Sequence, residues 1–346
     1  MARTVLGLDI GTKYIKYVAL NQHGGGRYEL FSVGMSPSPV RGVNSDAKVD
    51  HETLAVVIKK LLRDGGLKPR LVNVALPEVA VFTRIVSVPP LSERELASAI
   101  KWEAEQYIPL PLAEVEMDFS IVGETKDAEG NKRLDVLLVA APKVVIDRYN
   151  KVLELCELEA EAMETEIISA SRALLPPTPD KPLTVMVMNI GDQTTDFSIL
   201  KSNVIAFTRS IPTGGGSFTK VISQDLGLPI NQAEEFKKTY GLRQDQLEGK
   251  VYHALLPIFN VIVEEVKRAI TYFQNKFPEE VISSIILAGG SAKLPGMVEA
   301  LTNSVGLETQ IGDPWTRVSR DPQRFAKLDE EKAVFVVATG LAMREG

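Results

Sequence analysis

Gly7-Leu8-Asp9-Ile10-Gly11-Thr12-Lys13 closes a run of apolar residues with a glycine turn, and this pattern decides the fold. Two further segments repeat it along the chain, Asn189-Ile190-Gly191-Asp192-Gln193-Thr194-Thr195-Asp196 and Leu287-Ala288-Gly289-Gly290-Ser291. Each segment ends a β-branched and apolar run that predicts a buried strand. Because glycine has no Cβ, backbone N–H groups in such a turn can close on a phosphate group. Three such turns predict two similar halves that hold one nucleotide.

Size and charge narrow the class of protein. The chain has 346 residues, more than one hydrophobic core usually holds, so we expect at least two domains. A net charge of −6 and a pI of about 5.4 argue against nucleic acid as a partner. Cys156 is the only cysteine, which excludes an internal disulfide and makes a zinc site improbable. With no apolar stretch of roughly 20 residues and no signal-peptide core, we expect a cytoplasmic protein without direct membrane insertion.

The strand and turn signals predict an α/β protein with a faint internal repeat. Strands are expected at 4–10 and 14–20, and the same strand–turn–strand opening returns at 183–189 and 196–201. The proline-rich segment 176–182 before the second opening predicts a boundary. Among the helices that we expect are 216–226, 230–239, 243–248 and 251–276.

A block at 82–159 predicts a small α/β insertion in the first half. Its first helix begins with a capping box, Ser92 with Glu95, and runs to about Tyr107. Two strands are expected at 117–123 and 134–140, and a second helix at about 143–156.

The first turn offers phosphate and metal ligands. Gly11 and Thr12 supply N–H groups and a hydroxyl, and Lys13 or Lys16 would neutralise phosphate oxygens. A carboxylate beside phosphate cannot bind it directly, so Asp9 is expected to hold Mg²⁺ through water. An ordinary hairpin with a polar tip explains the same residues equally well.

The second turn is followed by a second glycine signal. Gly191, Gln193, Thr194 and Thr195 again place hydroxyls and N–H groups after a buried strand. Gly214-Gly215-Gly216 then opens a helix, where free N–H groups can capture an anion. A turn alone does not account for three successive glycines, so we favour a binding function.

Two more segments complete the predicted site. Glu234 and Lys237 are three residues apart and lie on one helix face, which equally suits a solvated salt bridge. The segment Gly289, Gly290, Ser291 and Lys293 would let a flat base slide against the backbone.

The order of these motifs resembles the actin-like ATPase superfamily, particularly its FtsA branch. The hairpin DxGT, the second GxxxT turn, GGxxxT, AExxK and GGxxxLPG all follow in sequence. The resemblance implies duplicated RNase H-like domains with an FtsA-type 1C insertion, and ATP with Mg²⁺ as cofactors. It also implies that phosphates lie between the two hairpins, while Glu234 and Lys237 approach the ribose and base.

The resemblance also implies a division into subdomains. Subdomain 1A would comprise 1–81 and 160–180 with the C-terminal helix 331–346, and the 1C-like insertion would comprise 82–159. Subdomain 2A would comprise 183–212 and 281–330, and subdomain 2B would comprise 213–280.

The inserted block carries the most family-specific segment. Ala99-Ile100-Lys101-Trp102-Glu103-Ala104-Glu105-Gln106-Tyr107-Ile108-Pro109 resembles the PilM family of type IV pilus assembly proteins, although packing within the insertion also explains its aromatic residues. FtsA proteins end in an amphipathic membrane-binding helix, and the end of this sequence favours PilM over FtsA. The resemblance implies a cytoplasmic protein held at the inner membrane by PilN, whose N-terminal peptide would dock near residues 84–107. Homo-oligomer formation stays open.

One departure from the superfamily pattern bears on catalysis. The second turn normally begins with an Asp near the metal, and here that position is Asn189, which loses the charge. Glu164 and Glu166 are the candidates for positioning the attacking water. We therefore expect ATP binding with weak or no hydrolysis. The alternatives are an FtsA-like membrane-associated filament protein and an actin-fold small-molecule kinase.

Overall fold

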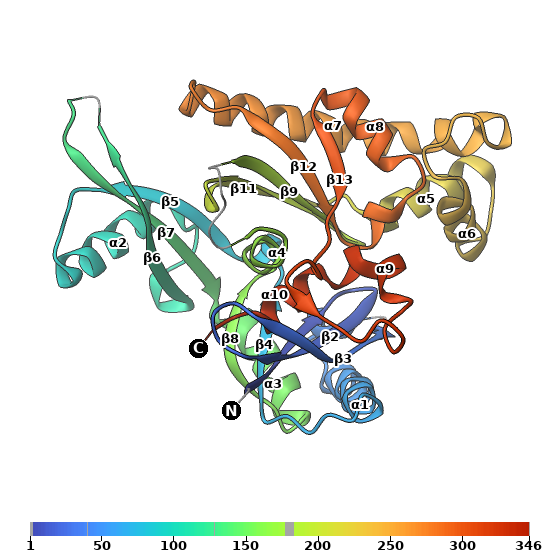
Figure 1. The fold of residues 1–346 in the computed structure, drawn as a ribbon, viewed down its shortest axis with the longest axis horizontal. Helices are drawn as coiled ribbons and strands as arrows, with labels where there is room; N and C mark the ends of the chain where they lie inside the picture. Colours follow the sequence, from blue (N-terminus) through green and yellow to red (C-terminus); the bar gives the residue numbers. More distant parts are fainter. Residues whose placement is uncertain (1–2, 40, 128, 177–182, 346) are drawn as a thin grey trace.

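The computed structural model describes residues 3–39, 41–127, 129–176 and 183–345. Residues 177–182 of the predicted proline-rich boundary lie outside this description. Within the described residues, three β-sheets are present, with six, five and three strands. Two of the sheets form the body of the molecule, and the third projects from it, on the left in Figure 1.

The six-stranded sheet forms the first half of the molecule. Its order is β14-β3-β2-β1-β4-β8, in which β1, β2 and β3 pair antiparallel and β4 and β8 continue in parallel. The strands are β1 (Arg3–Ile10), β2 (Tyr14–Gln22), β3 (Tyr28–Pro37), β4 (Leu71–Leu76), β8 (Glu159–Thr165) and β14 (Val318–Ser319).

The five-stranded sheet of the second half repeats this arrangement. Its order is β11-β10-β9-β12-β13, again an antiparallel meander followed by two parallel strands. The strands are β9 (Thr184–Ile190), β10 (Thr195–Lys201), β11 (Val204–Ile211), β12 (Ile282–Ala288) and β13 (Glu308–Ile311). The common strand order confirms the repeat predicted from the two strand–turn–strand openings.

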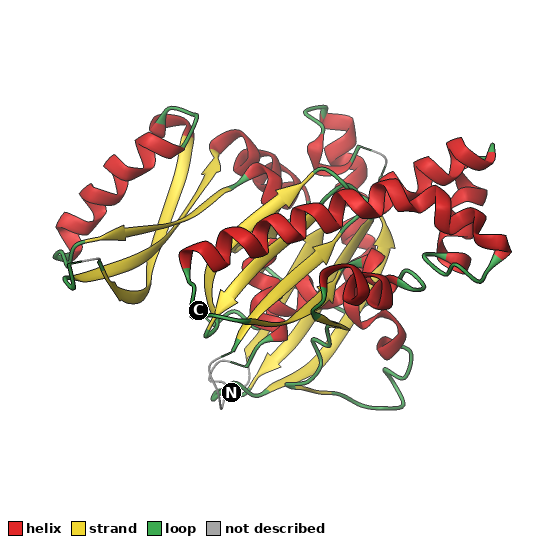
Figure 2. Ribbon diagram, turned by 90° about the horizontal axis from the view of Figure 1, so that it is seen from above, coloured by secondary structure: helices red, strands yellow, loops and turns green. Residues whose placement is uncertain are grey.

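Alternating side chains of β9 show how the second half is layered. Met186 and Met188 pack with apolar residues of α7 (Lys250–Lys276), the long helix in Figure 2. Val185 and Val187 face the other way, toward α4 (Glu166–Leu174) and α10 (Val336–Ala342). Successive residues of a strand point to opposite faces, so the apolar centre of β9, residues 185–188, is buried on both.

The remaining helices cover the two halves. Helix α1 (Lys48–Asp64) packs on the first sheet, and α10 also contacts β1 and β2 of that sheet. The second half also carries α5 (Gly215–Leu226), α6 (Ile230–Tyr240) and α8 (Met297–Val305). Short turns of helix connect the elements near the site: η1 (Gly42–Asn44), η2 (Glu78–Ala80), η5 (Gly290–Lys293), α9 (Leu328–Glu331) and η6 (Lys332–Phe335).

The projecting unit consists of one sheet and one helix. Strands β5 (Phe82–Val88), β7 (Lys132–Pro142) and β6 (Val115–Lys126) pair in that order, and α2 (Glu93–Tyr107) lies on them. The predicted capping box is confirmed, because the Ser92 N–H and hydroxyl both donate to the Glu95 carboxylate. The turn η3 (Leu112–Glu114) joins α2 to β6.

The second helix predicted for the insertion belongs to different surroundings. Helix α3 (Lys143–Leu155) buries Tyr149, Val152 and Leu153 in the apolar cluster that also contains α1 and β1. It therefore packs in the first half, whereas residues 82–142 form the projecting unit. We propose that the insertion expected at 82–159 ends near Pro142.

The helix predicted at 243–248 is wrong. This segment has no α-helix: turns and bends lead into η4 (Leu247–Gly249), in which Leu247 and Glu248 have φ values of 48° and 54°. These left-handed conformations cannot continue an α-helix.

No helix in the described parts of the chain is both long and apolar enough to cross a membrane.

Candidate nucleotide site

Two equivalent hairpin turns face each other across the middle of the molecule. The Gly11 N–H donates to the Tyr14 carbonyl at 3.1 Å, and the Gly191 N–H donates to the Thr194 carbonyl at 2.9 Å. A Cβ on Gly11 would lie 2.8 Å from the Tyr14 oxygen, so this tight turn requires glycine. The second half therefore repeats the turn of the first, residue for residue.

A cavity of about 580 Å³ lies between the halves. Its size is within the range of pockets that bind small molecules and cofactors. It brings together most of the residues predicted for the site: Asp9, Gly11, Thr12, Lys13, Lys16, Glu166, Asn189, Gly191, Gln193, Thr194, Gly215, Glu234, Lys237, Gly289, Gly290, Ser291 and Lys293.

The glycines at the start of α5 pack against the second turn. The Gly215 N–H donates to the Gly191 carbonyl and the Gly216 N–H to the Asp192 carbonyl, both at 2.8 Å. A Cβ on Gly214 would lie 2.7 Å from that Asp192 oxygen, and one on Gly215 would overlap the Ser291 hydroxyl. The N–H groups of Gly215 and Gly216 are thus bonded to the second turn, and anion capture at the start of α5 stays a prediction. Of the three, only Gly215 lines the cavity.

Thr195 also turns away from the cavity. Its side chain is fully buried and its hydroxyl donates to the Thr213 carbonyl at 2.7 Å. It therefore anchors the strand that follows the second turn.

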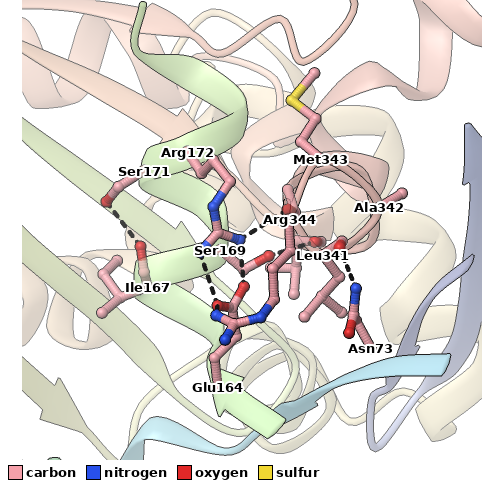
Figure 3. A network of polar contacts seen from close by, with 12 residues as sticks. Asn73, Glu164, Ile167, Ser169, Ser171, Arg172, Leu341, Ala342, Met343 and Arg344 are labelled. Carbon is pink, nitrogen blue, oxygen red and sulfur yellow. Dashed lines mark hydrogen bonds and ion pairs between the residues drawn. The ribbon is translucent and has the colours of Figure 1, made fainter. Parts of the chain in front are cut away.

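Glu164 does not line the cavity and instead belongs to a network of polar contacts with Arg172 and Arg344 (Figure 3). It forms a two-pronged ion pair with Arg172 of α4, and Arg344 reaches its second oxygen at 3.2 Å. Arg172 also donates to the Gly340 carbonyl at 2.8 Å. The prediction that Glu164 positions an attacking water is therefore corrected. Glu164 has a structural function instead, because it joins Arg344 to α4.

Glu166 is the predicted carboxylate that does reach the cavity. It opens α4 and accepts a hydrogen bond at 2.9 Å from the side-chain amide of Asn189. Burial raises the pKa of Glu166 well above its usual range, and the nearby Asp196 and Asp9 raise it further.

Glu234 and Lys237 form a bonded cluster that is more than the solvated pair considered from sequence. Lys237 Nζ donates to Glu234 Oε2 at 2.7 Å, to the Thr219 hydroxyl at 2.8 Å and to the Gly215 carbonyl at 2.9 Å. The ammonium group is buried and its three donors are used within the protein. Lys237 and Thr219 therefore position Glu234, although Thr219 itself does not line the cavity.

The cationic and anionic side chains of the cavity balance. Asp9 pairs with Lys16 at 2.5 Å, and Lys293 pairs with Glu331 at 2.7 Å. Among the described residues, five lysines and five carboxylates line it: Lys13, Lys16, Lys237, Lys238, Lys293, Asp9, Glu166, Asp192, Glu234 and Glu331.

Two further carboxyl groups lie behind the cavity wall. Asp196 pairs across the strands with Asn189 and accepts hydrogen bonds from Thr194 and Ser210. Burial raises its pKa to about 6 despite these bonds. Burial also raises the pKa of Glu78, on η2, to about 7.

Known proteins share this architecture. A family model described as type IV pilus assembly protein PilM matches residues 7–346. The chain belongs to the PilM family. It is similar to the structure titled PilM-PilN type IV pilus biogenesis complex, with 28% identity and a TM-score of 0.87 over 99% of both chains.

More distant relatives extend the comparison. The cell division protein FtsA of Neisseria meningitidis serogroup B (strain MC58) is 24% identical over 90% of this chain and 84% of its own length. MreB 5 of Spiroplasma citri, solved with AMPPNP, has a TM-score of 0.55 at 16% identity, over 98% of this chain and 95% of that one. At that identity the likeness concerns the fold alone. These comparisons confirm the predicted actin-like fold and the predicted PilM family.

Proposed function

We propose that this member of the PilM family is a cytoplasmic, ATP-binding component of the type IV pilus assembly platform. Its task is to recruit the N-terminal peptide of a PilN-like inner-membrane protein, which holds it at the membrane. The observation that carries this proposal is the likeness, over 99% of both chains, to a structure titled as a PilM-PilN complex.

The projecting unit supports peptide recruitment. Both β5 and β6 are edge strands of its sheet, and an extended peptide can add to such an edge through backbone hydrogen bonds. Arg84 on β5 stacks over the Tyr107 ring at 3.5 Å from its centroid, while Trp102 on α2 is 65% exposed. Trp, Tyr and Arg are enriched among the residues that contribute most to protein interfaces.

The cavity supports nucleotide binding. The two glycine turns meet at its wall, and MreB 5 of Spiroplasma citri was solved with both AMPPNP and ADP. No group of three or more His, Cys, Asp or Glu side chains in the described chain is arranged to hold a metal ion. Mg²⁺ commonly binds through one or two carboxylates, waters and phosphates, so Asp9 fits a metal that enters with the nucleotide.

The side chain of Asn189, in the second turn, supports ATP binding with little hydrolysis. Asn189 donates its amide N–H to Glu166, so this side chain is committed to a hydrogen bond. Asn189 has no negative charge where the superfamily pattern places an Asp near the metal, which would weaken metal-assisted hydrolysis. We therefore expect that ATP, with Mg²⁺, remains bound for long periods.

Peptide titration tests the recruitment function. A synthetic peptide of the cytoplasmic N-terminal residues of the PilN protein from the same organism is titrated by calorimetry, with and without Mg·ATP. We expect saturable binding that Trp102→Ala or Arg84→Ala weakens about tenfold. Absence of binding under both conditions would overturn this function.

A cavity-filling substitution tests nucleotide binding. A Cβ on Gly290 meets no atom within 4 Å, so Gly290→Leu would fill the cavity without displacing the backbone. We expect at least a tenfold loss of Mg·ATP affinity. Gly123→Leu, on β6, also meets open space and serves as the matched control. Equal affinity in both variants would place the nucleotide elsewhere.

A further inference from the structure

Tyr149 is a cavity residue that none of the glycine motifs includes. It lies on α3 and is only 3% exposed, yet it lines the cavity between the halves. A residue that is buried to this extent meets the cavity with a small part of its side chain. Because the ring belongs to the apolar cluster of the first half, the hydroxyl at its tip is the part that faces the cavity.

The ring of Tyr149 is held in one position beside the first turn. It packs in the same apolar cluster as Ile10, Ile15 and Val43. Ile10 directly precedes Gly11 of the first turn, Val43 belongs to η1, and both also line the cavity. A side chain in a close-packed core keeps one rotamer, so the hydroxyl is fixed in advance next to the predicted phosphate turn.

The hydroxyl of Tyr149 is a permanent hydrogen-bond donor. Burial raises the pKa of Tyr149, and the nearby Glu166 and Asp9 raise it further, while no hydrogen bond among the described residues lowers it. The phenol therefore keeps its proton at every physiological pH. A buried polar group without a partner is costly, so this donor is placed to meet a polar atom of a ligand.

Tyr149 and the residues expected at the ribose and base come from different halves of the molecule. Glu234 and Lys293 belong to α6 and η5 of the second half, and α6 lies far from α3 in Figure 1. The groups that act on the pKa of Tyr149 are instead Asp9 at the end of β1 and Glu166 at the start of α4. A nucleotide whose base lies against α6 and η5 would extend its phosphates past the two turns, and its last phosphate would reach farthest toward Tyr149.

We propose that the Tyr149 hydroxyl donates a hydrogen bond to the terminal phosphate of the bound nucleotide, so that Tyr149 selects a nucleoside triphosphate over a diphosphate. This inference rests on the proposed ATP binding and adds a specificity-determining residue to it. Hydrogen bonds to a charged phosphate are stronger than those between neutral groups. A diphosphate would leave the hydroxyl without this acceptor, and a site built to bond one group discriminates against a ligand that lacks it.

The first experiment removes the hydroxyl and keeps the ring. We expect Tyr149→Phe to bind Mg·AMPPNP about tenfold more weakly by calorimetry, and to bind Mg·ADP with less than a twofold change. AMPPNP is used because it resists hydrolysis, so the measurement reports binding alone. An equal loss for both nucleotides, or no loss for either, would overturn the assignment.

Tyr28→Phe is the matched control. Tyr28 is also buried in the first half, but its hydroxyl donates to the Met343 carbonyl at 3.4 Å and it does not line the cavity. We expect this variant to keep the affinities of the unmodified chain for both nucleotides. The midpoint of thermal unfolding without ligand, measured for both variants, separates a loss of affinity from a loss of stability.

Phosphorus NMR of bound Mg·AMPPNP provides a second readout, at the level of the individual phosphates. We expect the resonance of the terminal phosphorus to differ between the unmodified chain and Tyr149→Phe, while that of the phosphorus next to the ribose stays in place. A terminal resonance at the same position in both would overturn the contact. Absence of Mg·AMPPNP binding to the unmodified chain would overturn the proposed ATP binding itself, whereas binding that Tyr149→Phe leaves unchanged would overturn only the role of Tyr149.

Discussion

At the scale of single residues, Glu78 is a buried carboxyl group whose charged form is disfavoured in the folded protein. It is only 6% exposed, and Oε2 has no hydrogen-bond partner among the described residues. Burial raises its pKa to about 7, with a further contribution from the charge of Asp196. Such a group retains its proton in the folded protein at a pH where the unfolded chain has lost it.

This predicts a pH dependence that Glu78→Gln removes. Because the folded pKa lies above the unfolded value of about 4.5, the contribution of Glu78 to stability falls as the pH rises from about 4.5 to 7. We expect the glutamine variant to gain up to about 3 kcal/mol over the unmodified chain between pH 5 and pH 8. Thermal unfolding at both pH values measures the difference. Exposed Glu279→Gln is the control, and parallel pH profiles for the Glu78→Gln variant and the unmodified chain would contradict the prediction.

The two candidate carboxylates show what sequence can and cannot place. Register with the returning segment predicted both Glu164 and Glu166, and only Glu166 reaches the cavity. The chain changes from strand to helix at Thr165, which turns two nearby side chains toward different surroundings. Glu164 pairs instead with Arg172 and Arg344. Arg172 lies in the next helix and Arg344 is remote in sequence, so no local sequence pattern could reveal these ion pairs.

At the scale of elements, α4 and α10 approach so closely that a glycine is required. A Cβ on Gly340 would overlap the carbonyl oxygen of Ser169, whose hydroxyl donates to Val337 at 2.7 Å. These two helices also contribute to the apolar cluster that joins the halves. The contact is therefore a structural requirement of the whole cleft.

We expect Gly340→Ala to destabilise the protein by about 2 kcal/mol, because the helices must separate to admit the methyl group. The midpoint of thermal unfolding measures this change. Gly123→Ala, where a Cβ meets no atom within 4 Å, should leave the midpoint nearly unchanged. Similar midpoints for the two variants would show that α4 and α10 can shift without loss.

Elements with clear local signals were predicted, and those set by tertiary contacts were missed. The capping box placed the start of α2, and apolar runs placed β9 and β12. Strand β8 was not predicted, because its sequence EAEAMET is rich in residues that favour helix. Pairing with the buried strand β4 imposes the extended conformation.

At the scale of the molecule, the duplicated strand order explains why three short turns predicted the fold. Each half begins with a tight hairpin that turns at a glycine, which is required at Gly11 and closely packed at Gly191, so the repeat is visible in sequence even where side chains differ. The surroundings of α3 were not visible in the same way. The apolar face of α3 is compatible with packing in the projecting unit or in the first half, and only the three-dimensional structure shows that α3 packs beside α1.

The charge balance of the whole cavity yields the last prediction. Five lysines and five carboxylates line it in the described chain, so the cavity has no net positive charge when all are ionised. Retention of a proton by Glu166 adds at most one positive charge. A nucleoside triphosphate brings several negative charges, and Mg²⁺ that binds through its phosphates would neutralise part of them.

We expect chelation of Mg²⁺ to weaken ATP binding at least tenfold and ADP binding less, by calorimetry with and without EDTA. Equal ATP affinity in both conditions would mean that lysines released from their ion pairs neutralise the phosphates without a metal.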